Sequence, residues 1–270
     1  MNTFNLKNKI AVITGGTGVL GGNAANSLAA AGVKIVIIGR NQKLVDEKAT
    51  SIINNGIEAI GIAADILDKK SMQDALKIVL KQFKRIDILI NAAGGNMPGA
   101  TVGPEQTIFD IQLDDFKKVT ELNLNGTVIP SLVFGEEMAK QKTGIIINFS
   151  SLAVDRIITR VAGYSAAKAA VENFTKWMAV EMATKFGDKI RVNAVTPGFF
   201  IGNQNRALLT NEDGSYTDRG NTIINNTPMK RFGEADELNG LIHFLCSDAS
   251  KFITGAVIPV DGGFSAFSGV

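Results

Sequence analysis

A tyrosine and a lysine stand four residues apart in the stretch YSAAK, as Tyr164 and Lys168. Residues with this spacing share one face of a helix, so a helix here would place the lysine ammonium beside the phenol. A neighbouring positive charge favours the phenolate, which would let a tyrosine with an ordinary pKa of about 10 exchange protons nearer to neutral pH. The pair therefore predicts general acid–base chemistry.

Ser151 completes this group of reactive side chains. It stands thirteen residues before Tyr164, after the apolar run GIIINFS has reached Ser150. A hydroxyl at the end of a strand can donate a hydrogen bond to a substrate oxygen. The three side chains together suit hydride transfer, in which a carbonyl and an alkoxide interconvert. The helix that carries Tyr164 is predicted over 164–186, with Ser165 available as its capping residue.

The elements that must position these residues alternate regularly along the chain. Short apolar runs rich in β-branched residues are separated by longer segments of helical period. The runs are apolar throughout, as expected for strands covered by helices on both faces. We therefore predict an α/β fold, a single-domain Rossmann-type doubly wound parallel sheet of about seven strands. The predicted strands are 9–14, 34–39, 57–62, 86–91, 144–150, 189–195 and 256–262, and the predicted helices are 20–31, 42–55, 70–83, 112–140, 164–186 and 234–247.

Residues 199–233, here called the 199–233 segment, interrupt this alternation. The segment is rich in Asn, Thr and Gly and follows the predicted strand 189–195. A loop of this length inside a compact domain is usually functional, and ligands of such sheets bind beyond the carboxyl ends of the strands. We predict that it is a substrate lid within one catalytic domain that covers residues 1–270.

A glycine-rich turn follows the first predicted strand in AVITGGTGVLGG. Such glycines let the backbone approach a pyrophosphate, whose charge the following helix N-terminus stabilises. After the second strand, Gly39 and Arg40 offer space and a positive charge for the 2′-phosphate of NADP, where NAD binding would favour an acidic residue. NADP is the preferred prediction and NAD the alternative, because Arg40 could instead stack on the adenine or remain solvated.

The composition fits a globular protein with a small-molecule substrate. Apolar residues make up 45% of the chain, and 28 Lys and Arg residues face 26 Asp and Glu residues. This balance does not favour nucleic acid or a membrane surface as a partner. One cysteine, Cys246, and one histidine, His243, cannot build a zinc site, so no metal is predicted. No apolar run approaches the roughly 20 residues that cross a bilayer, and a cytoplasmic location is expected.

These motifs, in this order, resemble the short-chain dehydrogenase/reductase superfamily. The matching pieces are TGGTGVLG at 14–21, Asp65, NAAG at 91–94, Asn123 in LNLNG, Ser151, YSAAK at 164–168, VNAVTPG at 192–198 and VDGG at 260–263. The resemblance implies that Tyr164 is the acid/base, that Lys168 lowers its pKa and binds the nicotinamide ribose, that Ser151 orients the substrate carbonyl, and that Asn123 holds a proton-relay water. It also implies the cofactor-binding residues Gly15, Thr17, Gly18, Val19, Leu20, Gly21, Arg40, Asp65, Ile66, Asn91, Ala92, Ala93, Gly94, Tyr164, Lys168, Pro197 and Gly198.

Two positions depart from the usual pattern of that superfamily. Val19 stands where the glycine-rich loop of this size class has its middle glycine, so the loop reads TGxxGxxG. Gly202 stands where relatives often have a threonine, which removes one hydrogen bond expected near the nicotinamide carboxamide.

Within the superfamily the chain is similar to the D-mannonate oxidoreductases. The pieces are NAAGGNMPGAT (91–101), TRVAGYSAAKAAVENFTKWMAVE (159–181), PGFFIGNQNRALLTNEDGS (197–215), TPMKRFGE (227–234) and DGGFSAFSGV (261–270). This resemblance implies reversible reduction of D-fructuronate to D-mannonate by a homo-oligomer, a tetramer or dimer built on the helices near 112–140 and 164–186. The alternatives are a gluconate 5-dehydrogenase, a 2-deoxygluconate dehydrogenase, a 3-oxoacyl reductase, or a non-catalytic dinucleotide sensor on the same fold.

A sugar acid needs a cation at its carboxylate and amides or hydroxyls along its carbons. At least one of Arg160 and Arg206 is expected to meet the carboxylate, because a guanidinium matches its shape. Asn96 follows the glycine turn that would lie beside the nicotinamide. The predicted substrate-binding residues are Asn96, Ser151, Arg160, Gln204, Asn205 and Arg206.

Overall fold

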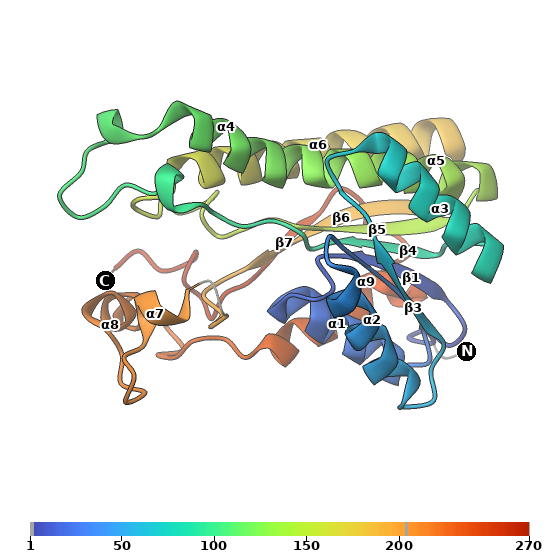
Figure 1. Cartoon of the computed structure of the whole chain (residues 1–270), viewed down its shortest axis with the longest axis horizontal. Coiled ribbons are helices and arrows are strands. Elements are labelled where there is room, and N and C mark those ends of the chain that lie inside the picture. Colours follow the sequence, from blue (N-terminus) through green and yellow to red (C-terminus); the bar gives the residue numbers. More distant parts are fainter. Residues whose placement is uncertain (1–2, 203–204, 270) are drawn as a thin grey trace.

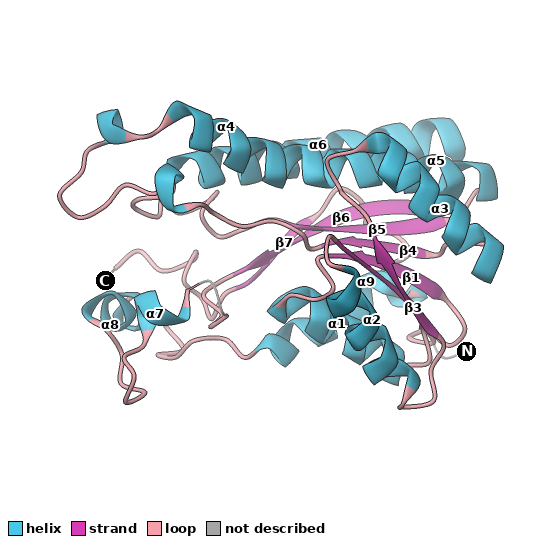
Figure 2. Cartoon of the chain, in the orientation of Figure 1, coloured by secondary structure: helices cyan, strands magenta, loops and turns pink. Residues whose placement is uncertain are grey.

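The computed structural model describes residues 3–202 and 205–269. Within them, seven strands form one parallel sheet in the order β3-β2-β1-β4-β5-β6-β7. This confirms the predicted doubly wound parallel sheet, which Figure 2 shows with its covering helices. The strands are β1 (Ile10–Thr14), β2 (Lys34–Gly39), β3 (Ala59–Ala63), β4 (Ile88–Asn91), β5 (Gly144–Phe149), β6 (Ile190–Pro197) and β7 (Val257–Val260).

Helices cover both faces of the sheet, as the unbroken apolar strands predicted (Figure 1). One face carries α3 (Lys69–Phe83), α4 (Leu113–Thr120), α5 (Gly126–Gln141) and α6 (Ala162–Phe186), and the other carries α1 (Val19–Ala30), α2 (Gln42–Ile53) and α9 (Asn239–Cys246). Each face has its own buried apolar cluster, so neighbouring residues of a strand such as Val12 and Ile13 belong to opposite clusters. Short 3₁₀ turns lie at Pro98–Ala100 (η1), Ile108–Asp110 (η2), Ala235–Leu238 (η4) and Asp248–Ser250 (η5). No helix in the described ranges has the length and apolarity that would let it cross a bilayer.

The helix predicted over 112–140 is broken in the structure. A π-helical turn, Glu121–Asn125 (η3), separates α4 from α5. Single π-turns inside α-helices often mark functional sites, and this one carries Asn123.

The helix that carries Tyr164 begins earlier than predicted. It starts at Ala162, and its N-cap, Val161, makes no side-chain capping bond. The prediction that Ser165 caps it is therefore wrong. Ser165 lies inside the first turn, where its hydroxyl oxygen is buried without a hydrogen-bond partner in the described part of the chain.

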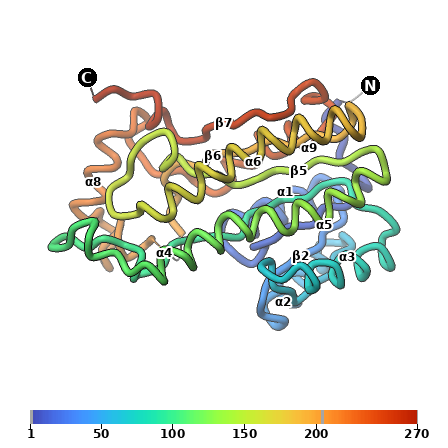
Figure 3. Tube along the Cα trace, turned by 90° about the horizontal axis from the view of Figure 1, so that it is seen from above, coloured from blue at the N-terminus to red at the C-terminus, as the bar shows by residue number. Residues whose placement is uncertain are grey.

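The 199–233 segment is more ordered than a loop. It contains two short helices, α7 (Arg206–Leu209) and α8 (Asp218–Asn225). Leu209, Ile223 and Phe232 form a small buried cluster separate from the two clusters of the sheet. The helices lie beyond the carboxyl ends of β5 and β6, on the side of the molecule where α6 begins (Figures 1 and 3).

Candidate active site

The predicted site residues follow the carboxyl ends of neighbouring strands. β1 ends at Thr14, β4 at Asn91, β5 at Phe149 and β6 at Pro197, and these strands are adjacent in the sheet. Chain order reverses between β1 and β4, and such a switch point is where open α/β sheets bind ligands. The topology thus brings the glycine turn, the NAAG loop, Ser151 and Gly198 to one edge.

The turn after β1 is shaped to receive a group on its backbone. Gly15 has φ +65°, and a Cβ there would lie 2.7 Å from the Ala93 amide nitrogen. A Cβ on Gly21 would lie 2.5 Å from the Gly15 carbonyl oxygen. Both positions therefore require glycine.

The N-terminus of α1, the helix that follows this turn, lies at the site and has no negatively charged side chain of its own. No side chain caps the N-terminus of α1, and no acidic residue lies in its first turn. By contrast, Asn41 caps α2 and Asp68 caps α3. An uncapped helix N-terminus beside glycines fits a pyrophosphate, so the residues present suit a dinucleotide.

Tyr164, Lys168 and Ser151 come together at the end of β5. A hydrogen bond links the Ser151 and Tyr164 side chains. The Lys168 ammonium lies 5.7 Å from the centre of the Tyr164 ring and donates to the Phe149 carbonyl oxygen at 2.7 Å. The side chains chosen from sequence spacing are therefore neighbours in space.

Burial moves the pKa of the two titratable groups in opposite directions. It raises the pKa of the Tyr164 phenol, while the Ser151 hydrogen bond lowers it in part. It lowers the pKa of the Lys168 ammonium to about 8. Each shift disfavours the charged form, as removal from water must.

Asn123 joins the π-turn to the loop after β4. Its amide donates to the carbonyl oxygens of Gly95 at 2.7 Å and Val119 at 2.8 Å, and its Oδ1 accepts from the Gly95 amide at 3.1 Å. A Cβ on Gly94 would lie 2.6 Å from this Oδ1 and 3.3 Å from the Lys168 nitrogen. The Asn123 side chain therefore positions the loop after β4, and this loop packs against both Asn123 and Lys168.

Comparison with known proteins decides the family. Residues 18–265 match the family model described as enoyl-(acyl carrier protein) reductase. An uncharacterized oxidoreductase of Bacillus subtilis, UxuB, is 44% identical, with 98% of each chain covered. The chain belongs to the short-chain dehydrogenase/reductase superfamily. It is thus an oxidoreductase that uses NAD or NADP.

Two solved structures of this superfamily are informative. A candidate D-mannonate oxidoreductase from Haemophilus influenzae, with bound NAD, has a TM-score of 0.93 and 41% identity, with 98% of each chain covered. A gluconate 5-dehydrogenase from Burkholderia cenocepacia, in complex with NADP and tartrate, has a TM-score of 0.87 and 30% identity, also with 98% of each chain covered.

The two departures from the superfamily pattern lie next to each other. The loop closes through a 2.9 Å hydrogen bond from the Gly18 amide to the Gly15 carbonyl oxygen, and Val19 begins α1. A Cβ on Gly202 would lie 3.6 Å from a methyl group of Val19. This is an ordinary van der Waals distance, so position 202 has room for a side chain beside Val19.

The remaining cofactor residues occupy the expected edge. Arg40 follows β2, is exposed, and makes no ion pair with a described residue. Asp65 accepts from the Leu67 amide at 2.9 Å, which orders the turn after β3. Ile66 is buried and packs where α5 begins, since a Cβ on Gly126 would lie 2.7 Å from its side chain.

The predicted substrate residues separate into different environments. Asn96 donates to the Thr101 hydroxyl at 2.7 Å, while its Oδ1 is buried and has no hydrogen-bond partner among the described residues. Arg160 is half-buried and Arg206 is exposed. Asn205 donates to the Phe200 carbonyl oxygen at 2.9 Å and accepts from the Gly202 amide at 2.7 Å, so its side chain orders its own loop. Gln204 lies outside the described residues.

Sequence reasoning missed a buried glutamate behind Ser151. Glu172 accepts a 2.6 Å hydrogen bond from the hydroxyl of Ser150. Burial raises the pKa of this carboxyl, and the Ser150 bond opposes the rise. The contact fixes the residue just before Ser151. Its one sequence signal is that Glu172 stands four residues after Lys168, on the same helix face.

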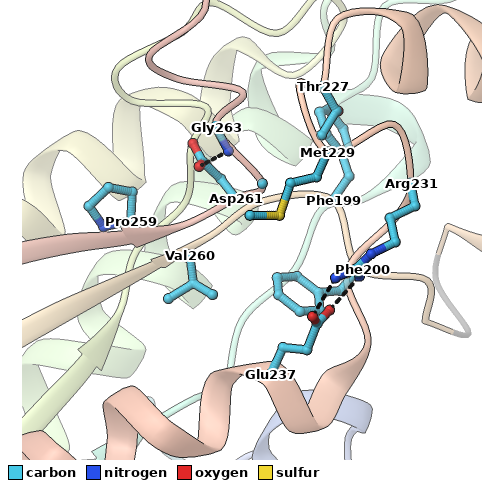
Figure 4. Close-up of a pocket in the computed structure, with 12 residues that line it drawn as sticks. Phe199, Phe200, Thr227, Met229, Arg231, Glu237, Pro259, Val260, Asp261 and Gly263 are labelled. Atoms are coloured by element: carbon cyan, nitrogen blue, oxygen red, sulfur yellow. Dashed lines mark hydrogen bonds and ion pairs between the residues drawn. The ribbon is translucent and has the colours of Figure 1, made fainter.

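A cavity of about 370 Å³ lies beyond the end of β6, between the 199–233 segment and the turn after β7 (Figure 4). Its lining includes Phe199, Met229 and Asp261, together with Arg231 and Glu237, which form a bidentate ion pair at 2.6 and 2.7 Å. None of the four catalytic candidates lines it. This cavity is therefore separate from the group formed by Tyr164, Lys168 and Ser151.

Proposed function

We propose that this enzyme reversibly reduces a keto sugar acid, with D-fructuronate to D-mannonate as the preferred reaction. The observation that carries the proposal is Arg160, a half-buried cation four residues before Tyr164 that has no carboxylate partner among the described residues. The similarity to the candidate D-mannonate oxidoreductase over 98% of the chain supports the same reaction. A gluconate 5-dehydrogenase is the second candidate, favoured by the structure that holds tartrate, a hydroxy acid.

The roles proposed for the chain's residues follow from their chemistry. In the reductive direction the Tyr164 phenol donates its proton to the ketone oxygen, and the raised pKa keeps that proton in place until it is needed. Ser151 donates a hydrogen bond to the same oxygen. The Lys168 ammonium, close to the ring, stabilises the phenolate that is left. Asn123 holds the loop after β4, and the proton-relay water assigned to it by resemblance stays a prediction.

The cofactor would occupy the edge already described. We infer that the glycine turn and the N-terminus of α1 hold the pyrophosphate, that Arg40 lies at the adenosine ribose, and that Lys168 binds the nicotinamide ribose. When bound, the nicotinamide supplies or accepts the hydride. Arg40 favours NADP in this proposal, and the related structures contain either NAD or NADP.

A substrate panel tests the function. The purified enzyme would be given D-fructuronate, 5-ketogluconate, a neutral ketohexose and a 3-oxoacyl thioester, each with NADPH and with NADH, while absorbance at the reduced nicotinamide band is followed. We expect the highest kcat/KM with D-fructuronate. Faster turnover of the thioester would contradict a sugar-acid substrate, and faster turnover of 5-ketogluconate would select the second candidate.

Tyr164→Phe serves as the matched control for the panel, because it removes one oxygen and keeps the ring. Loss of the acid is expected to lower turnover by about 10²-fold or more, with little change in cofactor affinity. Turnover equal to that of the wild type would overturn the acid/base role of Tyr164.

A further inference from the structure

Two arginines that are far apart in the sequence lie near each other, Arg160 four residues before Tyr164 and Arg219 in the 199–233 segment. Arg160 lies near the end of the loop between β5 and α6, and Arg219 lies in the first turn of α8. One guanidinium nitrogen of Arg219 is 3.5 Å from the hydroxyl of Thr159, the residue before Arg160. The 199–233 segment thus reaches the loop between β5 and α6 through the side chain of Arg219.

Arg160 and Arg219 have no acidic partner in the part of the chain that the structure describes. Both side chains are half-buried, and neither forms an ion pair within the described residues. Arg85 and Arg231, by contrast, pair with Asp87 and Glu237. Burial lowers the pKa of Arg219, and the positive charge of Arg160 lowers it further, so the two guanidinium groups repel each other. Partly buried like charges are unfavourable unless an anion joins them.

The backbone holds Arg160 in a demanding conformation. Its φ is +80°, in the left-handed region that a residue with a Cβ rarely adopts. Its carbonyl oxygen accepts from the Val102 amide at 3.0 Å, and the adjacent Thr101 accepts from Asn96. Strain of this kind persists where surrounding contacts enforce it and is concentrated at functional sites. The contacts tie Arg160 to the segment that carries the unpartnered oxygen of Asn96.

We propose that Arg160 and Arg219 together bind the carboxylate of the substrate, and that Arg219 makes the enzyme select acids over neutral ketones. The inference rests on the proposed sugar-acid reaction and deepens it, since it assigns the carboxylate to a residue that the sequence did not single out. Paired planar guanidinium groups match the geometry of a carboxylate. Arg206, which the sequence suggested for this role, lies in α7 and is exposed.

Arg219→Gln and Arg160→Gln test the assignment. Steady-state kinetics with saturating reduced cofactor would compare D-fructuronate with a neutral ketohexose. Loss of one charge-assisted contact is expected to raise KM for the acid about tenfold to a hundredfold, with kcat and the cofactor KM changed less than about threefold. Because both arginines serve one carboxylate, the double variant should lose less than the product of the single losses.

Two controls separate anion binding from structural effects. Lys189→Gln removes one exposed positive charge at the opposite end of β6 and should leave the KM for the acid unchanged. Thr159→Ala removes the partner of Arg219 but keeps both charges, so its effect should stay below about threefold. Arg219→Lys should fall between the wild type and Arg219→Gln, because an ammonium keeps the charge and loses the planar fork.

The outcomes distinguish this inference from the proposed function. If the wild type reduces D-fructuronate and Arg219→Gln keeps its KM, the arginine assignment is wrong while the function stands. If Arg219→Gln weakens acid and neutral substrates equally, Arg219 has a structural role and the assignment is again wrong. If the wild type reduces neutral ketones and no sugar acid, both proposals fail together.

Discussion

At the scale of single residues, Tyr164 and Lys168 depend on each other because burial disfavours the charged form of both. Burial raises the pKa of the phenol, which favours its neutral form, and lowers the pKa of the Lys168 ammonium to about 8, close to physiological pH. Stabilisation of a phenolate requires the lysine to be charged. The pair is therefore reactive only while Lys168 keeps its proton, and Lys168 loses that proton at mildly alkaline pH.

This dependence predicts a pH limit on ketone reduction. The charged fraction of a base falls as pH rises through its pKa, so kcat/KM should decline above pH of about 8, approaching tenfold per unit. Lys168→Arg is the control, since arginine stays charged throughout. Its residual activity should lose the decline. A profile of unchanged shape in that variant would assign the limit to another group.

A second residue-scale prediction concerns the choice of dinucleotide. Arg40 is exposed at the end of β2 with no ion pair to a described residue, so its charge is available to a 2′-phosphate. Arg40→Asp should lower the ratio of kcat/KM for NADPH to that for NADH by tenfold or more. Arg40→Gln should give a smaller change of the same sign. Equal ratios in all three proteins would show that Arg40 does not select the cofactor.

Residue types and spacing were enough to bring Tyr164, Lys168 and Ser151 together, because helix periodicity and strand ends are local properties. The direction of the Tyr164 pKa was not predictable in the same way. It depends on how deeply the phenol is buried, which the whole packed structure decides. Arg219 was missed for a similar reason, since its contact with Thr159 spans sixty positions of the chain.

At the scale of elements, the π-turn shows how a long-range contact reshapes a helix. The apolar period of residues 112–140 is continuous and predicted one helix, yet the helix breaks at Glu121–Asn125. There Asn123 hydrogen-bonds both the amide and the carbonyl group of Gly95 in the loop after β4. The apolar period of residues 112–140 gives no information about the contact with Gly95. The sequence predicts a loop for the 199–233 segment because the residues of its buried cluster, Leu209, Ile223 and Phe232, are scattered among polar ones and meet only in the fold.

The hydrogen bonds of Asn123 to Gly95 and Val119, here called the Asn123 latch, should contribute to the free energy of unfolding. Asn123→Ala would leave buried polar groups of Gly95 and Val119 without this partner, at about 1–3 kcal/mol for each unsatisfied group. We expect the free energy of unfolding, from urea titration, to fall by about 2–4 kcal/mol. Asn55→Ala is a suitable control because Asn55 is exposed and its side chain bonds only the carbonyl oxygen of Ser51 among described groups. A loss in Asn123→Ala no larger than in the control would exclude the latch.

At the scale of the whole molecule, the outer surfaces of α5 and α6 expose several large apolar side chains, where a solvent-facing helix surface is usually polar. Leu132 is 52% exposed, Trp177 64% and Val180 65%. The other surface of the same helices packs against the sheet through residues such as Phe134 and Met178. Exposed apolar residues gathered on neighbouring helices mark interaction surfaces, and a second copy of the chain is the partner expected from the superfamily.

The assembly can be tested by charging that surface. Light scattering coupled to size-exclusion chromatography should find the wild type as a dimer or tetramer, and Trp177→Asp with Val180→Asp should shift it to smaller species. An unpaired charge buried at an interface costs about 3–5 kcal/mol, enough to disfavour association at micromolar concentration. Ile53→Asp on α2, where Ile53 is 50% exposed, introduces the same charge elsewhere and should leave the mass unchanged. A wild type that elutes as a monomer, or a variant of unchanged mass, would rule out this face as the interface, and the reason for its exposed tryptophan would then lie in another partner.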